Sequence, residues 1–196
     1  DLGVDSTEAG TPRLWADVDA FSRDLSGRMA ASGATIGIGR YDEVRAFYSS
    51  DIFSTPGNDG PEWRTVHLGA DLLVQAGTPV LAPLDGIVKS VADNAGELDY
   101  GPTVILEHRA GARGDAFYTL YGHLARESVK PLREGQAVTR GTRIAAVGTP
   151  SENGGWPPHL HFQIITDLLG PSLRELASLV AHPGPWRRGD FPGVAR

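Results

Sequence analysis

Two histidines one residue apart are the first candidates for chemistry in this chain. His159 and His161 follow residues 154–158, a loop of glycine, tryptophan and proline. In a β-strand, residues i and i+2 point to the same side, so a strand here would present two imidazoles together. Taken alone, such a pair is more often plain surface than a metal site. Its significance therefore depends on the other histidines of the chain.

Two further histidine segments lie upstream, and both contain glycine. The first contains His67 and Asp71, and the second is the Tyr-Gly-His-Leu sequence around His123. If residues 67–71 formed one straight strand, the His67 and Asp71 side chains would be about 13 Å apart, too far to share one ion. Gly69 can supply a bend. We therefore predict a kinked segment that brings both side chains to one metal.

A donor set of two histidines and one carboxylate suits Zn²⁺ and leaves one tetrahedral position for water. Three protein ligands plus an open position are typical of catalytic zinc, whereas structural zinc is usually closed by four ligands. A water in the open position can have a pKa of about 7 and act as a nucleophile at neutral pH. The remaining histidines can stabilise an oxyanion or transfer a proton.

The composition favours one acidic domain and argues against several partners. The 196 residues are 40% hydrophobic, which is enough for one sizeable core. A net charge of -6 and a pI near 5.5 argue against a nucleic acid or an anionic membrane as the partner. Because the chain has no cysteine, disulfides and thiolate zinc sites are excluded.

The sequence predicts neither a membrane-spanning segment nor a signal peptide. No apolar run approaches membrane-spanning length, so we expect no membrane insertion. Residues 1–4 do not resemble a signal peptide, and the first residue is not Met. We interpret the chain either as a mature product or as a segment of a larger protein with flanking domains. The sequence leaves its cellular location open.

The chain divides into three predicted regions. Residues 1–34 hold an amphipathic helix that starts near Thr11 and ends near Ser32, with apolar residues at steps of three and four. Residues 35–167 show short β-branched runs separated by Gly, Pro and Asp, which is typical of a mainly β domain. Residues 168–196 begin with a short helical run and continue as a tail rich in proline and glycine.

The β region contains eight runs that we predict to be strands. They alternate with turn residues, and a glycine followed three residues later by an aliphatic residue recurs three times. This repeated spacing is typical of a sandwich whose strands cross between sheets at glycine turns. The predicted strands are residues 35–40, 44–48, 80–82, 86–92, 103–108, 117–123, 143–147 and 160–166.

Four other side chains allow a structural interpretation. We expect His108, at the end of a predicted strand, to face solvent, and Asp85 to serve a turn. Trp156 fits either a wall that stacks on substrate or loop packing. Tyr121 would share a strand face with His123 and fits either the site or the core equally well.

Residues 64–167 resemble the lysostaphin-type zinc endopeptidases, also called LytM-like. The core pattern of that family is His-x-x-x-Asp followed much later by His-x-His. In this chain the pattern is formed by His67 and Asp71, then by His159 and His161. The supporting stretches that also match are residues 77–88, 121–124 and 135–148.

The resemblance implies a site and an activity. It implies one Zn²⁺ per chain, bound by His67, Asp71 and His161, with His123 and His159 as the catalytic pair. It also implies a compact antiparallel β fold, a hybrid of sandwich and barrel, with the site in a groove between loops. Members of the family typically hydrolyse peptide bonds in the stem or cross-bridge peptides of bacterial peptidoglycan.

Two other functions fit the same residues. The first is a catalytically silent metal-binding or spacer module within a multidomain cytoplasmic protein, which would hold zinc without turnover. The second is a phosphocarrier in which facing histidines pass a phosphoryl group, a function that gives Asp71 no task. Zinc content, peptide hydrolysis and acceptance of phosphate from a phosphohistidine donor separate the three hypotheses.

Overall fold

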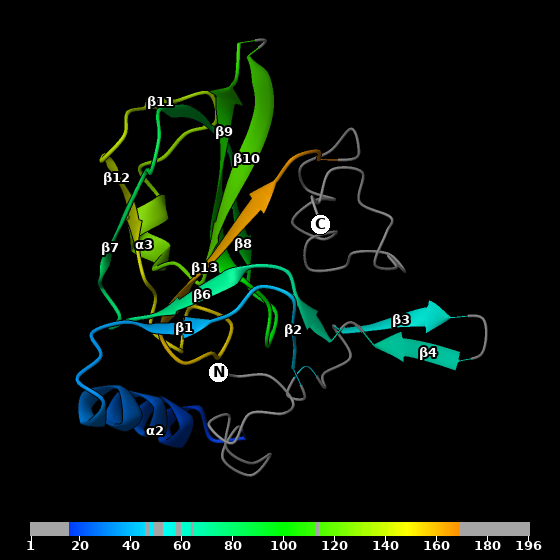
Figure 1. Ribbon diagram of the computed structural model, residues 1–196, viewed down its shortest axis with the longest axis vertical. Coiled ribbons are helices and arrows are strands. Elements are labelled where there is room, and N and C mark those ends of the chain that lie inside the picture. Colours follow the sequence, from blue (N-terminus) through cyan, green and yellow to red (C-terminus); the bar gives the residue numbers. More distant parts are fainter. Residues whose placement is uncertain are drawn as a thin grey trace.

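A seven-stranded antiparallel sheet forms the centre of the protein, which we describe from a computed structural model (Figure 1). The structure describes residues 16–45, 48, 53–57, 60–63, 65–112 and 114–168. The strands of the sheet, in spatial order, are β1 (Gly37–Gly39), β6 (Ala70–Leu73), β13 (His159–Ile165), β10 (Asp115–Gly122), β9 (Gly101–Ala110), β8 (Gly86–Asn94) and β11 (Ala137–Val138). This order places β6 beside β13, so the two predicted histidine motifs lie on neighbouring strands.

Within the described residues, three two-stranded antiparallel ribbons and two helices accompany the sheet. The hairpin of β3 and β4 extends away from the main sheet (Figure 1). The ribbons pair β12 (Arg143–Ala146) with β7 (Pro79–Leu81), β2 (Glu43–Val44) with β5 (Val66–His67), and β3 (Ser54–Gly57) with β4 (Gly60–Trp63), and the helices are α2 (Val18–Ala31) and α3 (Arg126–Val129). The predicted mainly β, antiparallel fold is confirmed.

The six strands predicted between residues 80 and 166 are confirmed, and each end lies within two residues of the predicted one. The earlier runs are also strands, but shorter than predicted, as β1 and β2. Strands β3 to β6 and strand β11 were not among the predicted strands. Runs of two to four residues are too short to show a clear alternating pattern.

The core lies against the middle of the main sheet. Val104 and Leu106 of β9, the strand between β8 and β10, are completely buried and belong to the main hydrophobic cluster. His108, further along the same strand, is also buried. Its Nδ1 lies 2.8 Å from the Asp85 carbonyl oxygen, and its Nε2 lies 2.8 Å from the Thr119 hydroxyl. The expectation that His108 faces solvent is wrong, because β9 is covered on both faces.

Two further residues have structural roles in this part of the fold. Tyr121 belongs to the core, with its hydroxyl 2.9 Å from the Thr119 hydroxyl. The Asp85 carboxylate accepts a hydrogen bond of 2.7 Å from the Arg140 backbone N–H, which fits the turn role expected of it. Neither side chain is available for the site.

Helix α2 begins later than the sequence predicts. Asp17 is extended and caps the helix by accepting a hydrogen bond of 2.9 Å from the Ala20 N–H, so the helix starts at Val18. The predicted start near Thr11 lies outside the described residues. The predicted end is confirmed, since Ser32 is the C-cap.

The two terminal regions of the chain are only partly described. The helix and the tail predicted for residues 168–196 lie outside the described residues, apart from Leu168. The division into three regions therefore stays a prediction. Within the described part of the chain, neither helix has the length and hydropathy needed to cross a membrane.

Leu106→Ala should lower the free energy of unfolding by about 2–5 kcal/mol, because it leaves a cavity in the buried centre of the sheet. Leu81→Ala is the matched control, since Leu81 is 51% exposed and its truncation should change stability by less than about 0.5 kcal/mol. Urea unfolding followed by circular dichroism measures both. Equal losses for the two variants would contradict the placement of the core.

Candidate metal centre

Asp71 and His161 face each other across neighbouring strands. The register of β6 and β13 pairs the two residues directly, and the same row continues to Gly39 in β1 and Gly122 in β10. A Cβ on Gly39 would lie 2.5 Å from Nη2 of Arg45. A Cβ on Gly122 would lie 3.5 Å from Cβ of His161. The closest atom to that added Cβ would be Cδ1 of Tyr100, at 2.7 Å, so the two glycines leave room for the Arg45 guanidinium beside Asp71 and for the Tyr100 ring beside His161.

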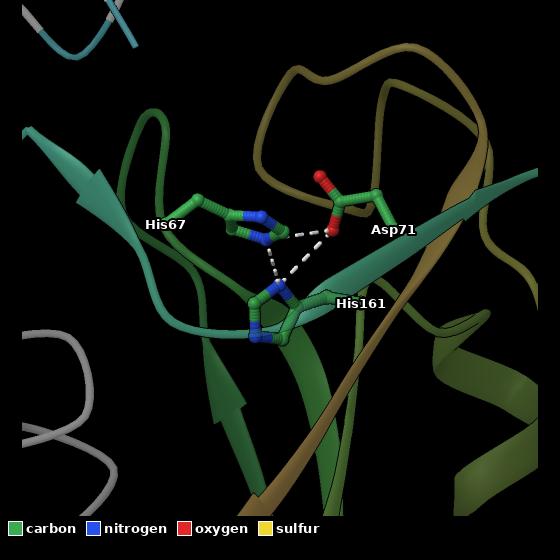
Figure 2. Close-up of side chains that lie close together, drawn as sticks. All are labelled: His67, Asp71 and His161. Carbon is green, nitrogen blue, oxygen red and sulfur yellow. Dashed lines mark hydrogen bonds and ion pairs between the residues drawn. The ribbon is translucent and has the colours of Figure 1, made fainter. Parts of the chain in front are cut away.

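Three donor atoms converge on one point. His67 Nε2, Asp71 Oδ1 and His161 Nδ1 are each 3.1 Å from the other two (Figure 2). All three residues are 2–3% exposed and form a group that could hold a metal ion. Tetrahedral zinc with nitrogen and oxygen ligands needs donor atoms about 3.3 Å apart. The triangle therefore has nearly the dimensions that a single ion requires.

Both imidazoles have polar partners on their outer nitrogens, away from the triangle. His67 Nδ1 donates to the carbonyl oxygen of Arg40, 2.7 Å away. His161 Nε2 faces the side-chain oxygen of Gln163 at 3.4 Å. In the neutral imidazole only one nitrogen carries a proton, so with the protons on these outer nitrogens each ring presents a lone pair to the Asp71 carboxylate. Three lone pairs held this close repel one another unless a cation lies between them.

The kink predicted between His67 and Asp71 is confirmed. Strand β5 ends at His67 and β6 begins at Ala70, with Gly69 between them. A Cβ on Gly69 would lie 2.5 Å from Cε1 and 2.6 Å from Nε2 of His161. Glycine is therefore required here by the ring of His161 that packs against the bend.

The remaining two predicted site histidines lie beside this triangle. His159 points to the same side of β13 as His161, with its Nε2 3.6 Å from Oδ1 of Asp71. The rings of His123 and His159 have centroids 4.2 Å apart. His123 Nδ1 lies 2.8 Å from the Asn153 carbonyl oxygen, and His159 Nδ1 lies 2.7 Å from the carbonyl oxygen of residue 157. Each ring thus donates through Nδ1 and keeps Nε2 as a proton acceptor.

His123 reaches this position through an uncommon backbone conformation. Strand β10 ends at Gly122, and His123 has a φ of 62°, in the left-handed region that costs a non-glycine residue about 1–3 kcal/mol. Its N–H donates to the Tyr100 carbonyl at 2.7 Å, and its carbonyl accepts from the Gly148 N–H at 2.9 Å. The expectation that Tyr121 and His123 share a strand face is wrong, because this turn redirects the His123 side chain.

The protonation states suit a metal site. Burial lowers the pKa of His123 well below its usual range, and the nearby His159 and His161 add to the effect. Burial also lowers the pKa of His159 and of His161, although Asp71 opposes it in both cases. Burial alone would raise the pKa of Asp71, but His159, His161 and its other basic neighbours outweigh it and hold that pKa well below the usual value. A carboxylate and neutral imidazoles result, the forms in which these groups bind metals.

Two residues near the site, Arg45 and Trp156, had either no role assigned from the sequence or an ambiguous one. Arg45 Nη1 lies 2.6 Å from Oδ2 of Asp71 and 3.0 Å from the Tyr48 hydroxyl. Trp156 lies edge-on to His123, with ring centroids 6.2 Å apart, and also packs with Tyr48 beneath helix α2. Trp156 thus has the packing role that the sequence allowed. Arg45 is 26 positions before Asp71, and no spacing rule marks such a pair.

The sequence pattern of one protein family covers this site. The model of peptidase family M23 matches residues 65–170, which are 106 of the 196 residues. The chain belongs to peptidase family M23. All five predicted site residues lie inside the M23 match, and the resemblance to lysostaphin-type peptidases is confirmed.

Individual relatives match over about half of the chain. An uncharacterized metalloprotease of Haemophilus influenzae is 42% identical over 97 residues, which are 50% of this chain and 18% of that protein. Peptidoglycan DD-endopeptidase ShyC of Vibrio cholerae is 31% identical over 101 residues, 52% of this chain and 20% of that protein. The matching region therefore makes up only about a fifth of the length of each of these relatives.

A solved structure, described as a zinc containing peptidase from Vibrio cholerae, is also similar to the chain. It is 28% identical, with a TM-score of 0.42, and the match covers 65% of this chain and 36% of that one.

Gly69→Ala should greatly reduce metal retention, because the new methyl group would displace the His161 ring. Gly27→Ala is the control, since it lies in helix α2 with nothing within 4 Å of the added Cβ and should be neutral or slightly stabilising. Elemental analysis after dialysis against Zn²⁺ and desalting measures the metal. Equal metal content in the two variants would contradict the close packing of Gly69 and His161.

Proposed function

We propose that this M23 domain is a zinc-dependent endopeptidase that hydrolyses a peptide bond in peptidoglycan peptides. One observation carries the proposal: His67, Asp71 and His161 direct three potential donor atoms, each 3.1 Å from the other two, at one point in a buried site. Membership of the M23 family supports a peptidase, and the similarity to peptidoglycan DD-endopeptidase ShyC of Vibrio cholerae supports peptidoglycan as the substrate class.

The residues of the triangle would hold one Zn²⁺ per chain. His67 would bind through Nε2, His161 through Nδ1 and Asp71 through Oδ1. Two imidazoles and one carboxylate match the chemistry of catalytic zinc sites, which keep a fourth position open. A zinc ion held there supplies Lewis-acid polarisation of a carbonyl group and lowers the pKa of water.

His123 and His159 would transfer protons during hydrolysis. Their Nδ1 protons are held by backbone carbonyls, so only Nε2 of each ring can accept a proton. The low pKa of each keeps that nitrogen free at neutral pH. An imidazole that takes a proton from the attacking water can return it to the leaving amine nitrogen. Before it does so, the imidazolium can donate a hydrogen bond to the oxyanion.

Purified wild-type protein should contain about one zinc per chain, and His161→Ala should lose it, because only two donor atoms of the triangle remain. His182→Ala removes a histidine outside the M23 match and is the control for the loss of an imidazole. Elemental analysis of protein prepared without chelators or affinity metal measures the ratio. Full zinc occupancy in His161→Ala would refute the assignment of this ligand.

His123→Ala and His159→Ala should each lower kcat by about 10²–10⁴-fold while the zinc content stays near one, because they remove proton transfer but no donor atom of the triangle. Mass spectrometry of digested muropeptides and cross-bridge peptides measures turnover, and elemental analysis of the same samples measures zinc. A wild-type protein that holds zinc but cleaves no peptide of the panel would instead support a silent metal-binding module.

A further inference from the structure

The two oxygens of the Asp71 carboxylate have different partners. Oδ1 belongs to the triangle of donor atoms with His67 and His161. Oδ2 points the other way and lies 2.6 Å from Nη1 of Arg45. An ion pair of this length between a guanidinium and a carboxylate is a strong, directional contact. Arg45 therefore binds the Asp71 carboxylate on the side opposite the donor triangle.

Arg45 is itself fixed in orientation. Its Nε and Nη2 atoms lie 3.0 and 2.9 Å from Oε2 of Glu43, and its Nη1 lies 3.0 Å from the Tyr48 hydroxyl. The side chains of Arg45 and Glu43 are 4% and 2% exposed, so water does not compete for these contacts. The planar guanidinium thus bridges two buried carboxylates, an arrangement that needs the several donors of arginine.

The surrounding strand leaves space for this arrangement. Gly39 of β1 lies directly across from Asp71 in the sheet, and a Cβ there would approach Nη2 of Arg45 to 2.5 Å. The guanidinium therefore occupies the volume that a side chain on β1 would otherwise fill. Position 39, position 71 and the arginine form one packed unit behind the donor triangle.

We propose that Arg45 is a positioning residue that keeps Asp71 a monodentate metal ligand. A carboxylate can bind an ion through one oxygen or through both. Because Arg45 holds Oδ2, only Oδ1 is available to the ion. A second oxygen would fill the coordination position that a catalytic zinc site keeps open for water or substrate. This inference rests on the zinc site proposed above and extends it to the residue that limits its coordination number.

The test compares three variants of the full 196-residue chain. Arg45→Met removes the charge and the fork of donors but keeps the length of the side chain, and Arg45→Lys keeps the charge alone. Arg109→Met is the matched control, because Arg109 also lies 2.6 Å from a carboxylate, that of Glu107, but is 66% exposed. Chelator competition measures zinc affinity, visible absorption of the Co²⁺-substituted protein reports coordination number, and thermal melting reports stability.

Arg45→Met should bind zinc about 10–100-fold more weakly than wild type, as expected for the loss of a group that orients a ligand. Its Co²⁺ absorption should weaken and shift, because Oδ2 becomes free to join the coordination sphere. Arg45→Lys should lie between wild type and Arg45→Met in zinc affinity and Co²⁺ absorption, because one ammonium cannot bridge both carboxylates as a guanidinium does. Arg109→Met should match wild type in affinity and spectrum.

A folded Arg45→Met protein with wild-type zinc affinity and Co²⁺ spectrum would overturn the inference. If Arg45→Met fails to fold, Arg45→Lys decides: wild-type affinity and spectrum in that variant would show that charge alone suffices and would overturn the role of the fork. A wild-type protein that binds neither metal would contradict the proposed zinc site itself. That result is distinct from the others because it is seen before any substitution at position 45.

Discussion

Two imidazole nitrogens and one carboxylate oxygen held close together in the interior of the protein are the arrangement that the rest of the structure must stabilise. A buried carboxylate is stable only where charges or hydrogen bonds replace water. The Asp71 carboxylate meets this demand with Arg45 on one oxygen and basic side chains around the other. The lone pairs of His67 and His161 add to the negative potential at Oδ1, so the position between the three atoms suits a cation.

Backbone carbonyl groups fix the imidazoles around that position. The carbonyls of Arg40, Asn153 and residue 157 each accept from an Nδ1 atom, which sets both the tautomer and the direction of the ring. The Asn153 side chain is fully buried and bonds to both the N–H and the carbonyl of Trp156 at 3.0 Å. This closed turn fixes the loop that holds two of the three accepting carbonyls.

The sequence predicted those parts of the site that depend on local periodicity. The common face of His159 and His161 follows from the two-residue repeat of a strand, and the bend at Gly69 follows from the distance that His67 and Asp71 must close. The six later strands were found because β-branched runs alternate with turn residues.

Features that depend on tertiary contacts were not predicted. His108 was misplaced, because local alternation does not reveal that β9 is covered on both faces. The left-handed backbone conformation at His123 was not predicted, because glycine and asparagine are the residues that usually indicate it and this position is a histidine. Arg45 meets Asp71 only after β2 and β6 are in place, so its role could not be read from spacing along the chain.

The pairing of β6 with β13 joins residues 90 positions apart in the chain. Side chains alternate along a strand, so a slip of one residue would turn His161 to the opposite face of the sheet and leave Asp71 facing a neighbour without an imidazole. A cation that binds only the aligned strands stabilises that alignment over every slipped one. In this way the metal site would act as a check on strand assembly during folding, separate from any reaction that the finished site performs.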